Sequence, residues 1–229
     1  RKQFPKAEIQ IYCALRRPDD YLVSWHGQRL KVGEKLDPLR KGGMRPYYDT
    51  IHFNFRAVIE SWSTLLPEAH LSLRSYTDIL ASGGSIEDFV AQSGIAFPTN
   101  LTPPQRANKS LPHAALEIVR QGNHALKSPQ AHALCQYLLR DSSELKPAPN
   151  KDVEMFGGSL RFKMAEQFDP VHEYLSKLTG QAQFFADFPQ ITQECPVPER
   201  QAVAQIPAAD LPDPALRTFI DTLKRGYAV

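Results

Sequence analysis

Arg16 and Ser24 are the residues of this chain best suited to bind a charged ligand. Residues 8–15 alternate between apolar and polar side chains and predict a strand, while residues 19–32 predict a helix that stops at Gly33. The strand would deliver the planar guanidinium of Arg16 to its carboxyl end, where open α/β sheets bind anionic ligands. The start of the helix adds backbone N–H groups and a favourable dipole. This arrangement predicts a phosphate site; the alternative is a basic strand end and a helix cap without a ligand.

The segment around these two residues resembles part of a known enzyme family. Residues 15–33 begin with LRRPDDYLVSW and are similar to the segment with which the bacterial branch of the PAPS-dependent sulfotransferases holds the 3′-phosphate of its nucleotide. PAPS is 3′-phosphoadenosine-5′-phosphosulfate. The resemblance implies that Arg16 and Ser24 contact this phosphate, and it makes Arg17 a further candidate. It also implies PAPS as co-substrate, no metal, and a P-loop-NTPase-like sulfotransferase fold, in which a short parallel sheet is flanked by many helices.

The resemblance covers residues 8–97 and continues more weakly over residues 98–180. The matching positions of the first range are Trp62, residues 74–80, Gly83, Gly84 and residues 88–95. The match departs at Thr77, where the family commonly has a glutamate. In the second range Asn108 is a further candidate for contact with the nucleotide phosphate, although helix capping by Ser110 is the favoured interpretation of that stretch.

A second phosphate-binding loop of the family, close to Pro-Lys-x-Gly-Thr-Thr, has no match in this sequence. In the family that loop precedes the 3′-phosphate arginine by many tens of residues, and its backbone N–H groups cradle the 5′-phosphosulfate. Only 15 residues precede Arg16 here. Because only two strands are predicted, we expect a fragment in which the first βα unit is missing. A degenerate relative that binds without catalysing is the alternative.

Sulfuryl transfer also needs a base that takes the proton of the acceptor hydroxyl, and no residue stands out for this role. In the family a histidine or a glutamate serves as the base. The catalytic residue therefore stays unknown, and the candidates beside the phosphate segment are His52, Asp49, Glu34 and Asp37. His26 lies two residues after Ser24, at a helix position that favours packing.

The composition is that of an ordinary globular chain, with 229 residues, 42% apolar and 23% charged. A formal net charge of +2 is too small to indicate nucleic acid as a partner. The three cysteines are far apart, show no metal-ligand spacing and favour a reducing compartment, so we expect a cytoplasmic location. We expect no membrane segment, because no apolar run is long enough to span a bilayer.

We expect one sulfotransferase-like domain over residues 1–229, with a nucleotide-binding α/β part over residues 1–97 and a mostly helical part over residues 98–229. Helical periodicity and capping patterns such as Ser-Pro and Asp-Pro predict further helices, and alternation predicts a second strand. The predicted helices are 48–66, 85–94, 129–140, 170–179 and 214–225, the strand is 70–76, and loops or extended connections are predicted over 142–158 and 190–212.

These features lead to the hypothesis of a sulfotransferase that moves a sulfuryl group from PAPS to a hydroxyl acceptor, with a carbohydrate as the expected partner. A glycosyltransferase that uses a nucleotide-sugar is one alternative. It would more often show an Asp-x-Asp metal motif, whereas the close acidic pairs here are Asp19-Asp20 and Glu87-Asp88. A non-catalytic binding remnant is the other alternative.

Overall fold

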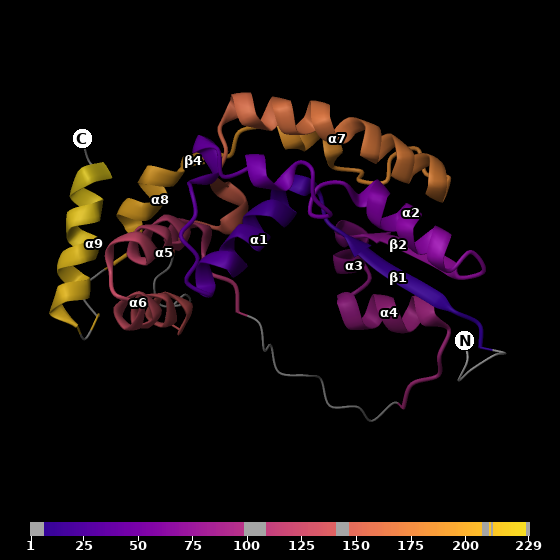
Figure 1. The fold of residues 1–229 in the computed structure, drawn as a ribbon, viewed down its shortest axis with the longest axis horizontal. Coiled ribbons are helices and arrows are strands. Elements are labelled where there is room, and N and C mark those ends of the chain that lie inside the picture. Colours follow the sequence, from indigo (N-terminus) through magenta and orange to yellow (C-terminus); the bar gives the residue numbers. More distant parts are fainter. Residues whose placement is uncertain (1–6, 99–108, 141–146, 208–210, 212, 228–229) are drawn as a thin grey trace. The chain divides into compact units, whose positions relative to one another are not determined.

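The fold is seen in a computed structural model that describes residues 7–98, 109–140, 147–207, 211 and 213–227 (Figure 1). Within these residues the chain is an α/β protein with two short pairs of parallel strands. The strands are β1 (Gln10–Leu15), β2 (His70–Ser75), β3 (Val153–Glu154) and β4 (Val197–Pro198). The helices are α1 (Pro18–Lys31), α2 (Phe55–Leu65), α3 (Tyr76–Ala81), α4 (Ser85–Ser93), α5 (His113–Ala125), α6 (Ser128–Arg140), α7 (Gly158–Thr179), α8 (Glu199–Gln205) and α9 (Pro214–Tyr227).

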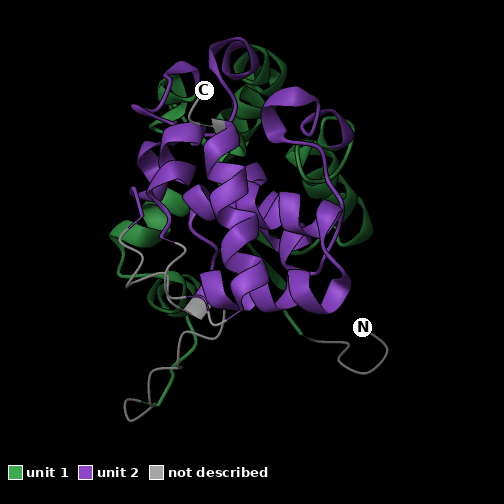
Figure 2. Ribbon diagram, turned by 90° about the vertical axis from the view of Figure 1, so that its left-hand side faces the viewer, with its two compact units in different colours: residues 1–21, 47–104, 163–191 green, residues 22–46, 105–162, 192–229 purple. Residues whose placement is uncertain are grey.

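The chain divides into two compact units, which Figure 2 distinguishes by colour. Unit 1 combines residues 1–21, 47–104 and 163–191. Unit 2 combines residues 22–46, 105–162 and 192–229. Each unit is therefore assembled from segments that lie far apart in the sequence.

Unit 1 is built on the parallel pair of β1 and β2, in which Gln10 is opposite His70 and Leu15 is opposite Ser75. Alternation along β1 sends successive side chains to opposite faces of the pair. Tyr12 meets Asp88 of α4 on one face, and Cys13 lies near Phe55 of α2 on the other. The two helices accordingly lie on opposite sides of the strands (Figure 1). The predicted strands 8–15 and 70–76 are confirmed as Gln10–Leu15 and His70–Ser75.

An aromatic core completes unit 1 around Phe168 of α7, which is fully buried. Its ring has neighbours on two segments, with Phe53 and Phe55 just before and at the start of α2 and Phe185 and Phe188 after α7. Helix α7 begins at Gly158 and runs through Pro170, so the prediction that this helix starts at residue 170 is wrong. Proline at that position removes one helical hydrogen bond. Burial of Met164, Phe168 and Leu175 on one face offsets that loss.

Unit 2 is mostly helical and buries the facing sides of α5 and α6, where Leu134 packs against Gly122. The predicted helices 129–140 and 214–225 are confirmed as α6 and α9. Two predictions are wrong in part. The expected loop 142–158 contains β3, and the expected extended connection 190–212 contains β4 and α8. None of these three elements shows in the sequence pattern, because each pairs or packs with a distant segment.

Three local features decide where the helices of unit 1 and α1 begin and end. Helix α2 starts at Phe55 rather than residue 48, because the Asn54 side chain accepts a hydrogen bond from the Ala57 N–H at 3.1 Å. Ser85 is the first residue of helix α4 and not its N-cap, which is Gly84. Helix α1 ends at Lys31, and Gly33 follows with a φ of 87°, a conformation that favours glycine.

Candidate functional site

The carboxyl edge of the β1–β2 pair carries the first sequence-predicted site residue, Arg16. Because Leu15 is opposite Ser75, the residues that follow the two strands, Arg16 and Tyr76, emerge at the same edge. The guanidinium carbon of Arg16 lies 4.1 Å from the centre of the Tyr76 ring, a cation–π contact. This contact orients the guanidinium without using any of its N–H donors.

The Nε atom of Arg16 is buried and has no hydrogen-bond partner among the described residues. A buried donor without a partner is costly, and native proteins keep few of them. The carboxylate of Asp20 lies near Arg16. Burial and the charge of Asp19 raise the pKa of Asp20 on balance, although the charges of Arg17 and Arg16 lower it. Arg16 therefore offers an oriented cationic donor at the strand edge where an anion would bind.

Arg17 is used differently, because its guanidinium is already bound to carboxylates of unit 1. Its Nε and Nη2 donate to the two oxygens of Asp19 at 2.6 and 2.9 Å. Its Nη1 donates to the side chain and to the main-chain carbonyl of Asp187, each at 2.9 Å. This bidentate geometry ties the segment around Asp187 to the start of α1 and leaves Arg17 little capacity for a ligand.

The other two predicted nucleotide contacts are Ser24 and Asn108. Ser24 is half-buried in the second turn of α1, and it belongs to unit 2, whereas Arg16 belongs to unit 1. Asn108 lies outside the described residues.

A small apolar pocket of about 200 Å³ adjoins Arg16 within unit 1. Its walls come from the end of β1, including Leu15, from Tyr21 of α1, and from the side of α2 that carries Phe55 and Ile59. The Tyr21 hydroxyl is hydrogen-bonded to His52 Nδ1 at 2.9 Å. Burial raises the pKa of Tyr21, so its phenol stays neutral at physiological pH.

Among the candidates for a base, the structure connects His52 to the Arg16 pocket, through Tyr21. Asp49 is exposed. Glu34 belongs to unit 2 and is paired with Arg29 at 2.6 Å. Asp37 is exposed in the same unit.

His26, the remaining candidate, is 3% exposed in unit 2, and burial lowers its pKa to about 4. It is neutral at physiological pH, and its place in the core agrees with the packing role expected from the sequence.

Two groups of unit 1 have no role in the predictions from the sequence. Tyr76 orients Arg16; it is the last residue of the predicted strand 70–76, whereas in the structure it follows β2 and begins α3. Arg74 of β2 makes a bidentate pair with Asp88, which is 1% exposed, with Nη2 to Oδ1 at 2.7 Å. Asp88 also accepts hydrogen bonds from the Tyr12 hydroxyl at 2.7 Å and from the Ser82 hydroxyl at 2.8 Å. These bonds lower the pKa of Asp88 to about 2, with the bond from Arg74 as the main cause.

The described parts of the chain hold no group of three or more His, Cys, Asp or Glu side chains placed to bind a metal ion. None of the helices seen in these parts is both long enough and apolar enough to cross a membrane. In comparisons with known proteins, no family model, no curated protein and no solved structure matches this chain.

Proposed function

We propose that this protein is a sulfotransferase-like protein that binds the 3′-phosphate of PAPS at the carboxyl edge of β1 and transfers the sulfuryl group to a hydroxyl acceptor, a glycan. The observation that carries the proposal is Arg16. Its guanidinium is oriented by Tyr76, and its buried Nε lacks a hydrogen-bond partner among the described residues. A tetrahedral oxyanion would supply the missing acceptor.

In the proposed reaction the acceptor oxygen forms a new S–O bond while the bond from sulfur to the phosphate oxygen breaks. The nucleotide leaves as adenosine 3′,5′-bisphosphate, and the acceptor proton passes to a base. His52 is the proposed base, because it is hydrogen-bonded to Tyr21 on the wall of the pocket beside Arg16. The protein's contribution is positioning of the two substrates and neutralisation of charge, as in phosphoryl transfer.

The pocket beside Arg16 limits what unit 1 binds by itself. Its volume of about 200 Å³ is below the usual range of roughly 300–1,000 Å³ for sites that enclose a small molecule. We therefore expect unit 1 to bind the phosphate and one attached group, and other residues to bind the remainder of the nucleotide.

Calorimetric titration with adenosine 3′,5′-bisphosphate, with 5′-AMP as control, tests the proposal. Selective binding of the bisphosphate is expected, because 5′-AMP lacks the 3′-phosphate. Arg16→Ala should abolish this selectivity, whereas Arg56→Ala, which changes an exposed arginine of unit 1, should not.

Equal affinity of a folded Arg16→Ala variant for the bisphosphate would refute the assignment of the phosphate site. Transfer of labelled sulfate from PAPS to a glycan, followed by mass spectrometry, then separates a catalyst from a binding protein. Selective binding without transfer would favour the non-catalytic alternative.

A further inference from the structure

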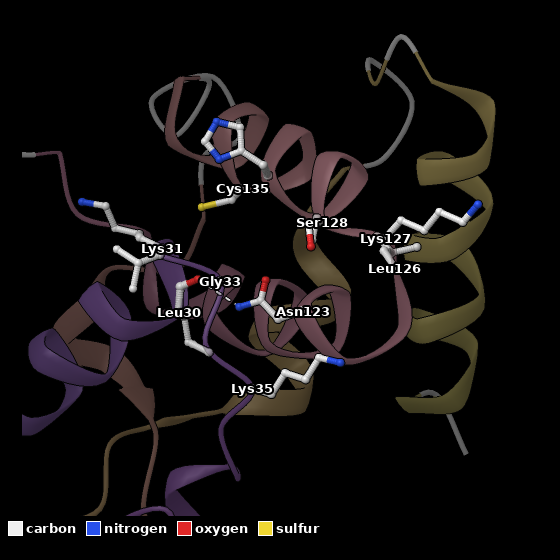
Figure 3. A pocket seen from close by; sticks show the side chains of 12 residues that line it. Leu30, Lys31, Gly33, Lys35, Asn123, Leu126, Lys127, Ser128 and Cys135 are labelled. Atoms are coloured by element: carbon white, nitrogen blue, oxygen red, sulfur yellow. Dashed lines mark hydrogen bonds between the residues drawn. The ribbon is translucent and has the colours of Figure 1, made fainter.

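A second pocket lies entirely within unit 2, between the end of α1, the end of α5 and the start of α6 (Figure 3). Its volume of about 570 Å³ falls within the range of roughly 300–1,000 Å³ that is usual for small-molecule sites. Nothing in the proposed sulfuryl transfer uses it.

The charge of this pocket has one sign. Three lysines contribute to its lining, Lys31, Lys35 and Lys127, and none of the lining residues is an aspartate or a glutamate. The Lys31 ammonium donates to the carbonyl of Lys109 at 2.9 Å. Lys35 and Lys127 are exposed and form no ion pair with the described residues. Figure 3 shows the three lysine side chains around the pocket rather than in its interior. From this position their positive charges would attract an anionic group to the rim of the pocket.

The interior supplies hydroxyl-binding groups. Asn123 is 6% exposed, and its Nδ2 donates to the carbonyls of Leu30 and Glu34 at 2.9 and 3.0 Å. Both amide hydrogens are thereby used, which leaves the amide oxygen as an acceptor. Figure 3 shows this oxygen directed toward the side of the pocket where the Ser128 hydroxyl lies. An acceptor beside a hydroxyl suits a ligand that carries hydroxyl groups of its own.

The remaining wall holds His132 beside mostly apolar residues, among them Leu30, Leu126 and Ala131. A sugar ring presents an apolar face of C–H groups and a rim of hydroxyl groups, so it matches the apolar wall and the Asn123–Ser128 side together. The lysines at the rim add a preference for an anionic substituent.

We propose that this pocket binds a saccharide that carries a phosphate or a sulfate group. The ring packs on the apolar wall, its hydroxyl groups reach Asn123 and Ser128, and its oxyanion lies near Lys35 and Lys127. The inference does not depend on the phosphate site at Arg16, because every residue of the pocket belongs to unit 2.

Calorimetric titration of the full chain with glucose 6-phosphate, glucose 6-sulfate and glucose tests this site. Both anionic sugars are expected to bind at least about 10-fold more tightly than glucose, because each charge-assisted contact with a lysine adds affinity. A preference between the two anions identifies phosphate or sulfate as the natural substituent.

Two variants and one control locate the binding. Combined Lys35→Gln and Lys127→Gln should weaken binding of the anionic sugars by at least about 10-fold, with little effect on glucose. Ser128→Ala should weaken the binding of all three sugars. Lys151→Gln changes an exposed lysine of unit 2 that does not line the pocket and should change nothing.

The proposal is overturned if neither anionic sugar binds at millimolar concentration, or if glucose binds as tightly as they do. It is also overturned if the folded double lysine variant keeps wild-type affinity.

Discussion

Arg16 and Arg74 lie near the carboxyl ends of neighbouring strands in unit 1, yet their surroundings differ. Arg74 donates to the two oxygens of Asp88, which is buried and takes further hydrogen bonds from Tyr12 and Ser82. Arg16 lies over the Tyr76 ring, and its buried Nε has no partner within the described chain. A buried carboxylate thus uses the donors of an arginine in a structural ion pair. An arginine oriented by a ring alone keeps its donors for a ligand.

The largest expected effect follows from removal of Asp88, the ion-pair partner of Arg74. Asp88→Ala should lower the free energy of unfolding by about 2–3 kcal/mol, somewhat less than for a fully buried pair, because Arg74 keeps some exposure to water. Urea unfolding followed by circular dichroism measures this loss.

The pH dependence of the same variant provides a control. The folded pKa of Asp88 is about 2, below its ordinary value of 3.8, so its contribution is complete above pH 3.8 and is lost as the pH falls toward 2. The difference in stability between wild type and Asp88→Ala should shrink over that interval. A constant difference would contradict the ion-pair explanation.

The second largest effect concerns Arg16, whose buried Nε has no hydrogen-bond partner among the described residues. Arg16→Ala should weaken binding of adenosine 3′,5′-bisphosphate by about 10- to 100-fold, the loss of one or two charge-assisted hydrogen bonds. Its melting temperature should stay close to that of the wild type, because no hydrogen bond of Nε is lost. A large fall in stability would show that Arg16, like Arg74, has a structural role.

The pair of Arg40 with Glu199 in unit 2 differs from the pair of Arg74 with Asp88, because at Glu199 the effect of burial on the pKa outweighs that of the arginine. The two groups are 3.1 Å apart, yet burial raises the pKa of Glu199 to about 7. Between pH 4.5 and 6.5 this raised pKa makes the protein less stable as the pH rises. Over the same interval His26, whose folded pKa is about 4, makes it more stable, so the two contributions oppose each other.

Removal of one contribution should expose the other. With Glu199→Gln, the free energy of unfolding should rise from pH 4.5 to 6.5 with an added slope of up to about 1.4 kcal/mol per pH unit relative to the wild type. Urea unfolding across this range measures the slope. Parallel curves for the two proteins would show that Glu199 does not take up its proton on folding.

The local elements of unit 1 could be predicted because their causes are local. Alternation marked β1 and β2, and Gly33 and Gly94 marked the ends of α1 and α4. Helix α7 could not be predicted through Pro170, because the burial of Phe168 among rings from other segments is not visible in a short stretch of sequence. The exposure of Trp62 likewise depends on what packs against α2, and not on the helical spacing of its apolar residues.

That an arginine follows a strand and precedes a helix could be read from the sequence, since periodicity and turn residues act over a few positions. Which of the two arginines has hydrogen-bond donors left for a ligand depends on contacts made in the folded protein. Arg16 and Arg17 are adjacent and chemically identical, but Asp187, 170 positions away, binds Arg17, and Tyr76 lies under Arg16. Side-chain partners of this kind come from long-range packing, which the order of residues in one segment does not contain.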